Sequence, residues 1–274
     1  LAWFAEKAGE HSSINGKLTA NINLSNKTWE GFGEYDYNDA SSGFNGILDG
    51  DGYTINGLSG DGGLVYCLGP DGEITNLTIA GEISGISNIG GIADTAKGTI
   101  ENCYFSGVIS NSSGSVSTGG IAGRAMSGSI IRSCASSADV NNTYAYYNSS
   151  LNVGGIAGYA YGIVDSCYFT GEITAREDRT NRYIGGIAGQ LYSGGEIRNC
   201  YSIGTVGGPE DGIGAIAGGN QGTVSNTYFI SGTGLKSVAE NSGTNGAKEV
   251  DSAAMKTGRF AYDLGENFNQ DTDN

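Results

Sequence analysis

The side chains that could do acid–base chemistry in this sequence are carboxylates, because the chain has 29 Asp and Glu, 14 Lys and Arg, and one His. A glycoside hydrolase needs two carboxyl groups about 5–9.5 Å apart on one face. Glu73 and Glu101 occupy outward places in successive repeats, so we expect them about 4.8 Å apart if the repeats stack as strands. The same column continues with Arg132, Asp165, Arg198 and Ser225. Because it alternates in sign in places, we interpret it as a solvated face with weak ion pairs, and the two glutamates as the best hydrolase candidate.

Two further patterns could bind a metal ion or form disulfides. Asp49-Gly50-Asp51-Gly52 hints at a Ca²⁺ loop, but it lacks the further ligands and the terminal Glu, so we interpret it as a tight turn. Four of the five cysteines fall in one inward column: Cys103, Cys134, Cys167 and Cys200. Thiols stacked about 4.8 Å apart are too distant for a disulfide, and a straight column does not match a tetrahedral metal site. We therefore predict buried thiols that act as small apolar side chains, with no metal and no cofactor.

Tyrosine and arginine side chains are the candidates for ligand binding. Tyr168, Tyr201 and Tyr228 follow the cysteine column and would stack on the surface, either as a platform for sugar rings or to stabilise the coil. Two inserts between repeats carry Tyr144, Tyr146 and Tyr147 and, one repeat later, Arg176, Arg179, Arg182 and Tyr183. Inserts at equivalent positions project from one side of a stack of repeats, so the two would be neighbours. This composition is typical of interaction hot spots and glycan recognition, and ordinary solvated loops are the alternative.

A repeat positions these residues. The segment Gly-Gly-Ile-Ala-Gly, or a variant of it, recurs with its central residue at Leu64, Ile92, Ile121, Ile156, Ile187 and Ile216, at spacings of 28, 29, 35, 31 and 29 residues. A second segment of the type Ile-x-Asn-Cys follows each copy and begins at Ile74, Ile100, Ile131, Val164, Ile197 and Val224. Such a period predicts a solenoid in which each unit packs only on its neighbours.

The local chemistry of the repeats favours strands over helices. Short runs rich in Ile, Val, Thr, Tyr and Phe are broken every few residues by Gly, Asn or Ser, and no 3.6-residue period is sustained. We predict an all-β fold, a right-handed parallel β-helix with short helical caps. An inner column should alternate Phe with smaller residues. A corner column should form a polar ladder, and its members are Asn76, Asn102, Ser133, Ser166, Asn199 and Asn226.

Three segments are expected along the chain. Residues 1–60 would form an N-terminal cap and the first turn or turns, residues 61–232 the repeats, and residues 233–274 a C-terminal segment with a capping helix. Helices are predicted over residues 1–9 and 252–264, where they would shield the ends of the solenoid from edge-to-edge association. We expect a monomer.

Composition excludes several classes of function. A net charge of -15 argues against nucleic-acid binding and against an anionic membrane surface, since phosphate binding depends on Lys and Arg. The sequence contains no run of about 18 apolar residues, the length that a helix needs to cross a membrane. The chain begins at Leu1 without a leader and ends in a polar stretch, so we expect a piece of a longer, secreted protein.

Gly-Gly-Ile-Ala-Gly followed by Gly-Thr-Ile-x-Asn-Cys-Tyr resembles the GLUG repeat, and the run from Ile22 to Ile55 looks like the segment that precedes such repeats. The resemblance implies a right-handed β-helix displayed by Gram-positive, often gut-dwelling bacteria, with an adhesive or scaffolding role, as in the non-catalytic part of IgA-specific metalloendopeptidases. The peptidase motif His-Glu-x-x-His is absent, because His11 is preceded by Glu10 and followed by two serines. The consensus Leu-Val pair is Ile-Ala in most copies.

These observations predict a non-enzymatic extracellular module. It would be an adhesin, ligand-binding or scaffold domain of a bacterial cell-surface or cell-wall protein, and its partner would be a host or microbial surface glycan or protein. A carbohydrate-active β-helix enzyme, either a glycoside hydrolase or a polysaccharide lyase, is the alternative. A passive spacer without a ligand is the third possibility.

Overall fold

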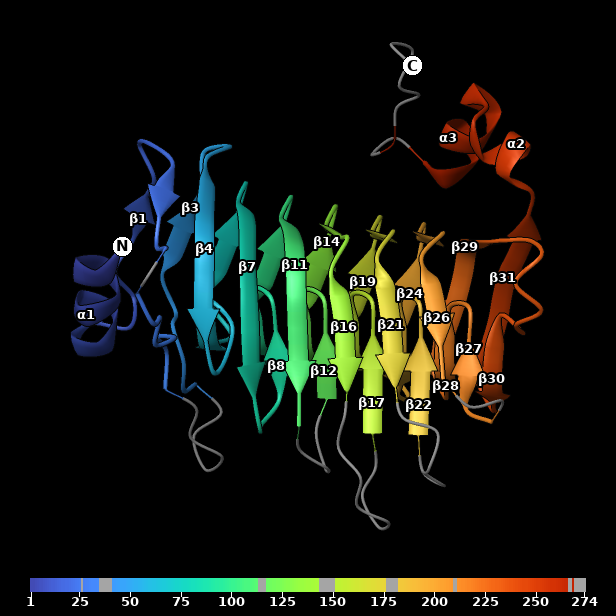
Figure 1. Ribbon diagram of the computed structural model, residues 1–274, viewed down its shortest axis with the longest axis horizontal. Helices are drawn as coiled ribbons and strands as arrows, with labels where there is room; N and C mark the ends of the chain where they lie inside the picture. Colours follow the sequence, from blue (N-terminus) through green and yellow to red (C-terminus); the bar gives the residue numbers. More distant parts are fainter. Residues whose placement is uncertain are drawn as a thin grey trace.

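The chain winds into a parallel β-solenoid whose axis runs horizontally in Figure 1, with the N-terminal helix at one end. The computed structural model describes residues 1–25, 27–34, 41–112, 117–142, 151–175, 182–208, 211–265 and 268. Three parallel sheets, of 19, 7 and 5 strands, run along the coil. The predicted parallel β-helix is confirmed, and the pairing of strands from successive turns supplies the hydrogen bonds that hold it together.

The 19-stranded sheet, here called the long sheet, supplies two strand segments or one longer strand in most turns. Its strands are β1 (Gly16–Lys17), β2 (Ile22–Asn23), β3 (Ile47–Asp49), β4 (Thr54–Gly60), β6 (Glu73–Thr75), β7 (Thr78–Gly85), β10 (Thr99–Glu101), β11 (Tyr104–Asn111), β14 (Ile130–Arg132), β15 (Ala135–Ser136), β16 (Asp139–Asn142), β19 (Ile163–Asp165), β20 (Tyr168–Phe169), β21 (Glu172–Ala175), β24 (Glu196–Arg198), β25 (Tyr201–Ser202), β26 (Thr205–Gly207), β29 (Thr223–Ile230) and β31 (Thr244–Val250).

Two smaller sheets close each turn. The 7-stranded sheet, called the alanine sheet after the Ala that begins most of its strands, contains β5 (Val65–Leu68), β9 (Ala93–Ala96), β13 (Ala122–Ala125), β18 (Ala157–Ala160), β23 (Ala188–Leu191), β28 (Ala217–Asn220) and β30 (Val238–Asn241). The 5-stranded sheet contains β8 (Ile89–Gly90), β12 (Ser117–Gly119), β17 (Leu151–Gly154), β22 (Arg182–Gly185) and β27 (Ile213–Gly214). The repeated Gly-Gly-Ile segment is the bend between these two sheets.

The core consists of side chains of like kind in register. Ile100 pairs with Ile74 on one side and Ile131 on the other, and all three are fully buried. The inner column that alternates large and small residues also forms as predicted, because Phe105 pairs with Ser136. The second Gly of the repeat makes room for the large members: a Cβ on Gly155 would lie 2.2 Å from the ring of Phe169.

The corner between the two segments of the long sheet carries the predicted polar ladder. All six Asn and Ser residues of that column have positive φ, between 41° and 54°, a backbone conformation that Asn tolerates better than most residues. Asn102 Nδ2 donates to Asn76 Oδ1 at 2.8 Å, and Asn226 Nδ2 donates to Asn199 Oδ1 at 2.8 Å. At its two ends the ladder therefore joins successive turns where the backbone bends, between Asn76 and Asn102 and between Asn199 and Asn226.

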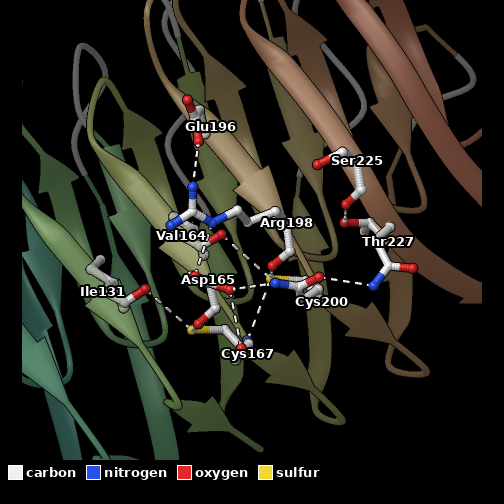
Figure 2. Close-up of polar contacts among 12 residues, drawn as sticks. Ile131, Val164, Asp165, Cys167, Glu196, Arg198, Cys200, Ser225 and Thr227 are labelled. Carbon is white, nitrogen blue, oxygen red and sulfur yellow. Dashed lines mark hydrogen bonds and ion pairs between the residues drawn. The ribbon is translucent and has the colours of Figure 1, made fainter. Parts of the chain in front are cut away.

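The cysteine column is a set of buried thiols next to this ladder. Cys167 Sγ donates to the carbonyl of Asp165 at 3.2 Å and to that of Ile131 in the preceding turn at 3.5 Å, as Figure 2 shows. Cys103, Cys134 and Cys200 make the same two kinds of contact. All five cysteines are free thiols. Burial raises the pKa of Cys103 and Cys167, so these thiols act as apolar, weakly hydrogen-bonding side chains.

Helix α1 (Ala2–Glu10) covers the first turn of the coil (Figure 1). Phe4 makes edge-on contacts with Phe32 and Phe44, at ring-centroid distances of 5.7 and 5.8 Å. Ala8 is 2% exposed against the same core. This helix shields the end of the apolar interior, as the sequence predicts.

The C-terminal helical region differs from the single helix expected over residues 252–264. It consists of α2 (Ser252–Met255) and α3 (Gly258–Leu264). The break arises because Asp251 and Thr257 each cap a helix start: Asp251 Oδ1 accepts from the Ala254 N–H at 2.7 Å, and Thr257 Oγ1 from the Phe260 N–H at 3.2 Å. Helix α3 packs on tyrosines of two successive turns, along the side of the coil, and does not lie across its last strands.

Candidate functional site

The glutamate pair proposed for a hydrolase does not form. Glu101 pairs in register with Thr75, and Glu73 pairs with Thr99, so the two glutamates stand two positions apart along neighbouring strands and not on one rung. Glu101 instead makes an ion pair with Arg132 at 2.7 Å. The expectation of a 4.8 Å carboxylate pair is therefore wrong, because the alignment placed Glu73 in the column that Thr75 occupies.

The rest of that outward column is the predicted ion-paired face. Asp165 lies between Arg132 and Arg198 in register, and Arg198 contacts both Asp165, at 2.9 Å, and Glu196, at 2.8 Å (Figure 2). Burial opposes ionisation of Asp165, but hydrogen bonds from Asn199, Arg198 and Ser166 outweigh it and lower the pKa of this carboxyl. These contacts stabilise the coil, and the two carboxylates of the column, Glu101 and Asp165, are both paired with arginines.

The tyrosine column forms, but the chain covers much of it. The rings of Tyr168 and Tyr201 are parallel, with centroids 4.9 Å apart and 2° between their planes. Phe260 of α3 packs edge-on against Tyr228, at 5.1 Å, and Tyr201, at 6.0 Å. Tyr228 is 6% exposed, and Phe268 lies 5.8 Å from Tyr201. The outer surface of Tyr201 and Tyr228 therefore serves as the docking surface for the C-terminal segment.

The two inserts are described only in part. Tyr144, Tyr146, Tyr147, Arg176 and Arg179 lie outside the described residues. Of the remaining insert residues, Arg182 is 9% exposed, and its Nε donates to the Asp211 carbonyl at 2.8 Å. Tyr183 is half-buried and lines an open pocket on the alanine sheet.

A cluster of tyrosines on the alanine sheet was missed by the sequence reasoning. Tyr159 lies 5.0 Å from Tyr161 and 4.3 Å from Tyr192, and Tyr161 stacks on Tyr192 at 4.6 Å. The Arg124 guanidinium carbon lies 5.3 Å from the centre of the Tyr159 ring. We call these four residues the tyrosine face. A signal for it exists in the sequence, since Tyr161 and Tyr192 each follow the last Gly of a repeat by three positions.

The open pocket continues from the tyrosine face along the coil. It has a volume of about 230 Å³ and is lined by the half-buried ring of Tyr183 and by polar side chains that include Gln190 and Glu240. Gly219 allows the ring to lie there, because a Cβ at this position would be 2.7 Å from it. Burial and the nearby Glu240 carboxylate raise the pKa of Tyr183. Burial and the hydroxyls of its two neighbours likewise raise the pKa of Tyr159, so Tyr159 and Tyr183 are neutral hydrogen-bonding groups at ordinary pH.

The part of the chain that the structure describes holds no group of three or more His, Cys, Asp or Glu side chains placed to bind a metal ion. Within the same residues, none of the helices is both long and apolar enough to cross a membrane. The candidate site is an open surface of aromatic rings with one cation and an adjoining polar pocket.

Known proteins share the repeat. Residues 149–174 and 180–207 match the family described as the GLUG motif. In the structure these two matches lie on successive turns, where β17 pairs with β22 and β18 pairs with β23. The β-helix therefore contains GLUG repeats. Halomucin of Haloquadratum walsbyi is 31% identical to this GLUG-repeat chain over 188 residues, which are 64% of this chain and 2% of halomucin. The immunoglobulin A1 protease of Streptococcus sanguinis is 33% identical over 141 residues, 48% of this chain and 7% of the protease.

Solved structures show the same fold as this GLUG-repeat β-helix. The crystal structure of a Bacteroides ovatus protein assigned as an immunoglobulin A1 protease has a TM-score of 0.68 with 22% identity, and the match covers 90% of this chain and 80% of that one. A structure named IgA1 protease has a TM-score of 0.66 with 18% identity, over 89% of this chain and 20% of that one. The chain thus spans a small part of the curated relatives that it matches.

Proposed function

We propose that this GLUG-repeat β-helix is a non-enzymatic, ligand-binding module of an extracellular surface protein and that its ligand is a glycan. The tyrosine face is the binding surface. The tyrosine face takes the place of the covered tyrosine column as the binding platform, and the expected partner, a host or microbial surface glycan or protein, is narrowed to the glycan.

The observation that carries the proposal is the grouping of three half-buried tyrosine rings, Tyr159 on β18 of the alanine sheet and Tyr161 and Tyr192 just beyond the ends of β18 and β23, beside a polar pocket. Sugar rings pack on aromatic faces because their C–H surfaces are apolar, while their hydroxyls need hydrogen-bond partners at the edge of the ring. Tyr159 and Tyr192 supply the apolar ring surface that their contacts with each other, with Tyr161 and with Arg124 leave exposed. Gln190 and Glu240 supply amide and carboxylate groups one or more rungs away in the same column.

Two lines of support favour a surface module over an enzyme. The names of the relatives, halomucin and immunoglobulin A1 protease, are those of surface or secreted proteins, and the matched parts are small fractions of both. The pair of glutamates proposed for a hydrolase does not form, because Glu101 is paired with Arg132 and is out of register with Glu73. No other observation favours the carbohydrate-active enzyme.

The test is a glycan array followed by titration of the best-bound oligosaccharide, with the protein and with the variant Y159A/Y192A. Each lost aromatic contact is worth about 1 kcal/mol, so the double variant should bind at least about tenfold more weakly. Y262A is the matched control, since Tyr262 is 77% exposed on α3, which packs on the opposite tyrosine column. Equal binding by the protein and the double variant, or an empty array, would refute the proposal.

A further inference from the structure

One column of the alanine sheet joins two groups of opposite charge along the proposed binding surface. Arg124, Tyr159, Gln190, Gly219 and Glu240 succeed one another in register on β13, β18, β23, β28 and β30. Four steps of about 4.8 Å place the first and last residues about 19 Å apart along the coil axis. The surface therefore has a cationic end, an aromatic middle and an acidic end, and a ligand that binds along it has a preferred direction.

Arg124 differs from three other described arginines. Arg132, Arg198 and Arg259 each form an ion pair with a carboxylate, at 2.7 to 2.9 Å. Within the described residues Arg124 has no carboxylate partner, although the chain has a net charge of -15. A guanidinium that stacks on a ring keeps its N–H edge available, and this edge matches the two oxygens of a carboxylate. Arg124 is thus placed to bind an anion beside the Tyr159 ring.

Gln190 adds an amide to the wall of the pocket, one rung from Tyr159. The residue is 5% exposed, lines the pocket, and its amide has no hydrogen-bond partner among the described residues. An amide that faces an open pocket hydrogen-bonds to water there and can exchange that water for ligand hydroxyls. Ligand hydroxyls in the pocket would give this amide both a donor and an acceptor.

The acidic end of the surface suits neutral sugars. Glu240 is exposed at the pocket rim, and the neighbouring Asn241 and Ser242 add an amide and a hydroxyl. A carboxylate accepts hydrogen bonds from sugar hydroxyls but repels another carboxylate. A ligand with one acidic sugar would therefore keep its acid away from Glu240 and next to Arg124.

We propose that the surface binds an oligosaccharide with a carboxylate-bearing sugar, whose acid lies on Arg124 above Tyr159, while the neutral sugars that follow pack on Tyr192 and enter the pocket of Gln190 and Glu240. The proposal rests on the function proposed above and adds the ligand class and its direction. A sialic acid and a uronic acid both supply this carboxylate.

The test compares acidic and neutral probes of matched shape. Sialyllactose is titrated beside lactose, and oligogalacturonate beside its methyl ester, which keeps the sugars and removes the charge. The protein should bind the acidic member of at least one pair tenfold or more better, and the pair that shows this identifies the acid. Arg124→Gln should remove most of that preference, whereas the control Arg259→Gln should keep it. Glu240→Ala should weaken the acidic and the neutral probe by similar factors.

The outcomes separate this inference from the proposed function. Equal binding of acidic and neutral probes, or a preference that survives in Arg124→Gln, overturns the inference and leaves glycan binding intact. An acidic preference lost in Arg124→Gln but with no effect of Glu240→Ala overturns the proposed direction. Binding of none of the probes, together with an empty glycan array, refutes the proposed function itself. Circular dichroism and thermal unfolding of each variant show that any loss is not a folding defect.

Discussion

The corner ladder can be tested by placing glycine at two equivalent positions with different contacts. Asn199 and Ser133 have φ of 54° and 51°, so glycine relieves the same backbone strain at both and adds the same freedom to the unfolded chain. Asn199 donates to Asp165 Oδ1 at 2.9 Å and accepts from Asn226 Nδ2 at 2.8 Å. The Ser133 hydroxyl makes no hydrogen bond among the described residues.

The difference between the two variants therefore measures the hydrogen bonds. A bond to a charged group contributes about 1.5–3 kcal/mol and one between neutral groups about 1 kcal/mol. After about 1 kcal/mol of strain relief, Asn199→Gly should lower the free energy of unfolding by about 2 kcal/mol. Ser133→Gly should leave it unchanged or raise it by up to about 1 kcal/mol. Urea unfolding followed by circular dichroism provides the comparison. Equal changes in both variants would show that the ladder contributes no stability.

Three other changes probe the packing of the coil. Phe260→Ala should lower the free energy of unfolding by about 3 kcal/mol and make Tyr201 accessible to nitration, which mass spectrometry detects. A Tyr201 that stays protected would contradict the contact with α3. Gly155→Ala should lower the unfolding free energy by about 1–3 kcal/mol, because its Cβ would clash with Phe169, and an unchanged urea midpoint would contradict that packing. Burial raises the pKa of Asp94 to about 8, above the value of about 3.9 in an unfolded chain. The contribution of protonated Asp94 to the free energy of unfolding is therefore fully present below pH 4 and is lost as the pH rises to 8. Between pH 5 and 8.5 the melting temperature should fall less in Asp94→Asn than in the unchanged protein. An equal fall in both proteins would refute the raised pKa of Asp94.

The repeat made the architecture and the inner columns predictable. Residues of the types of Ile100 and Cys167 recur at fixed offsets, and strands of successive turns that pair in register place these equivalent positions above one another. The corner was predictable for the same reason, since Asn is among the few residues that adopt positive φ at low cost.

Features outside the strict repeat were not predictable in the same way. Glu73 was misplaced by two positions, because alternation along a strand puts Glu73 and Thr75 on the same outward side and the pattern does not distinguish them. The position of α3 depends on the contact between Phe260 and Tyr228. Because Phe260 lies outside the repeats, the repeat spacing does not predict this contact. The tyrosine face combines Tyr159, which pairs in register with Arg124, with the rings of Tyr161 and Tyr192 from a neighbouring column. These residues come from different turns and columns, so their grouping is visible only in the folded structure.

The most direct test of the proposed binding surface is an NMR titration of tyrosine-labelled protein with sialyllactose or oligogalacturonate. The account predicts that the ring signals of Tyr159, Tyr161 and Tyr192 shift together and saturate with one affinity, while those of Tyr228 and Tyr262 stay in place. Shifts confined to tyrosines away from the alanine sheet, with these three unchanged under saturating ligand, would contradict it.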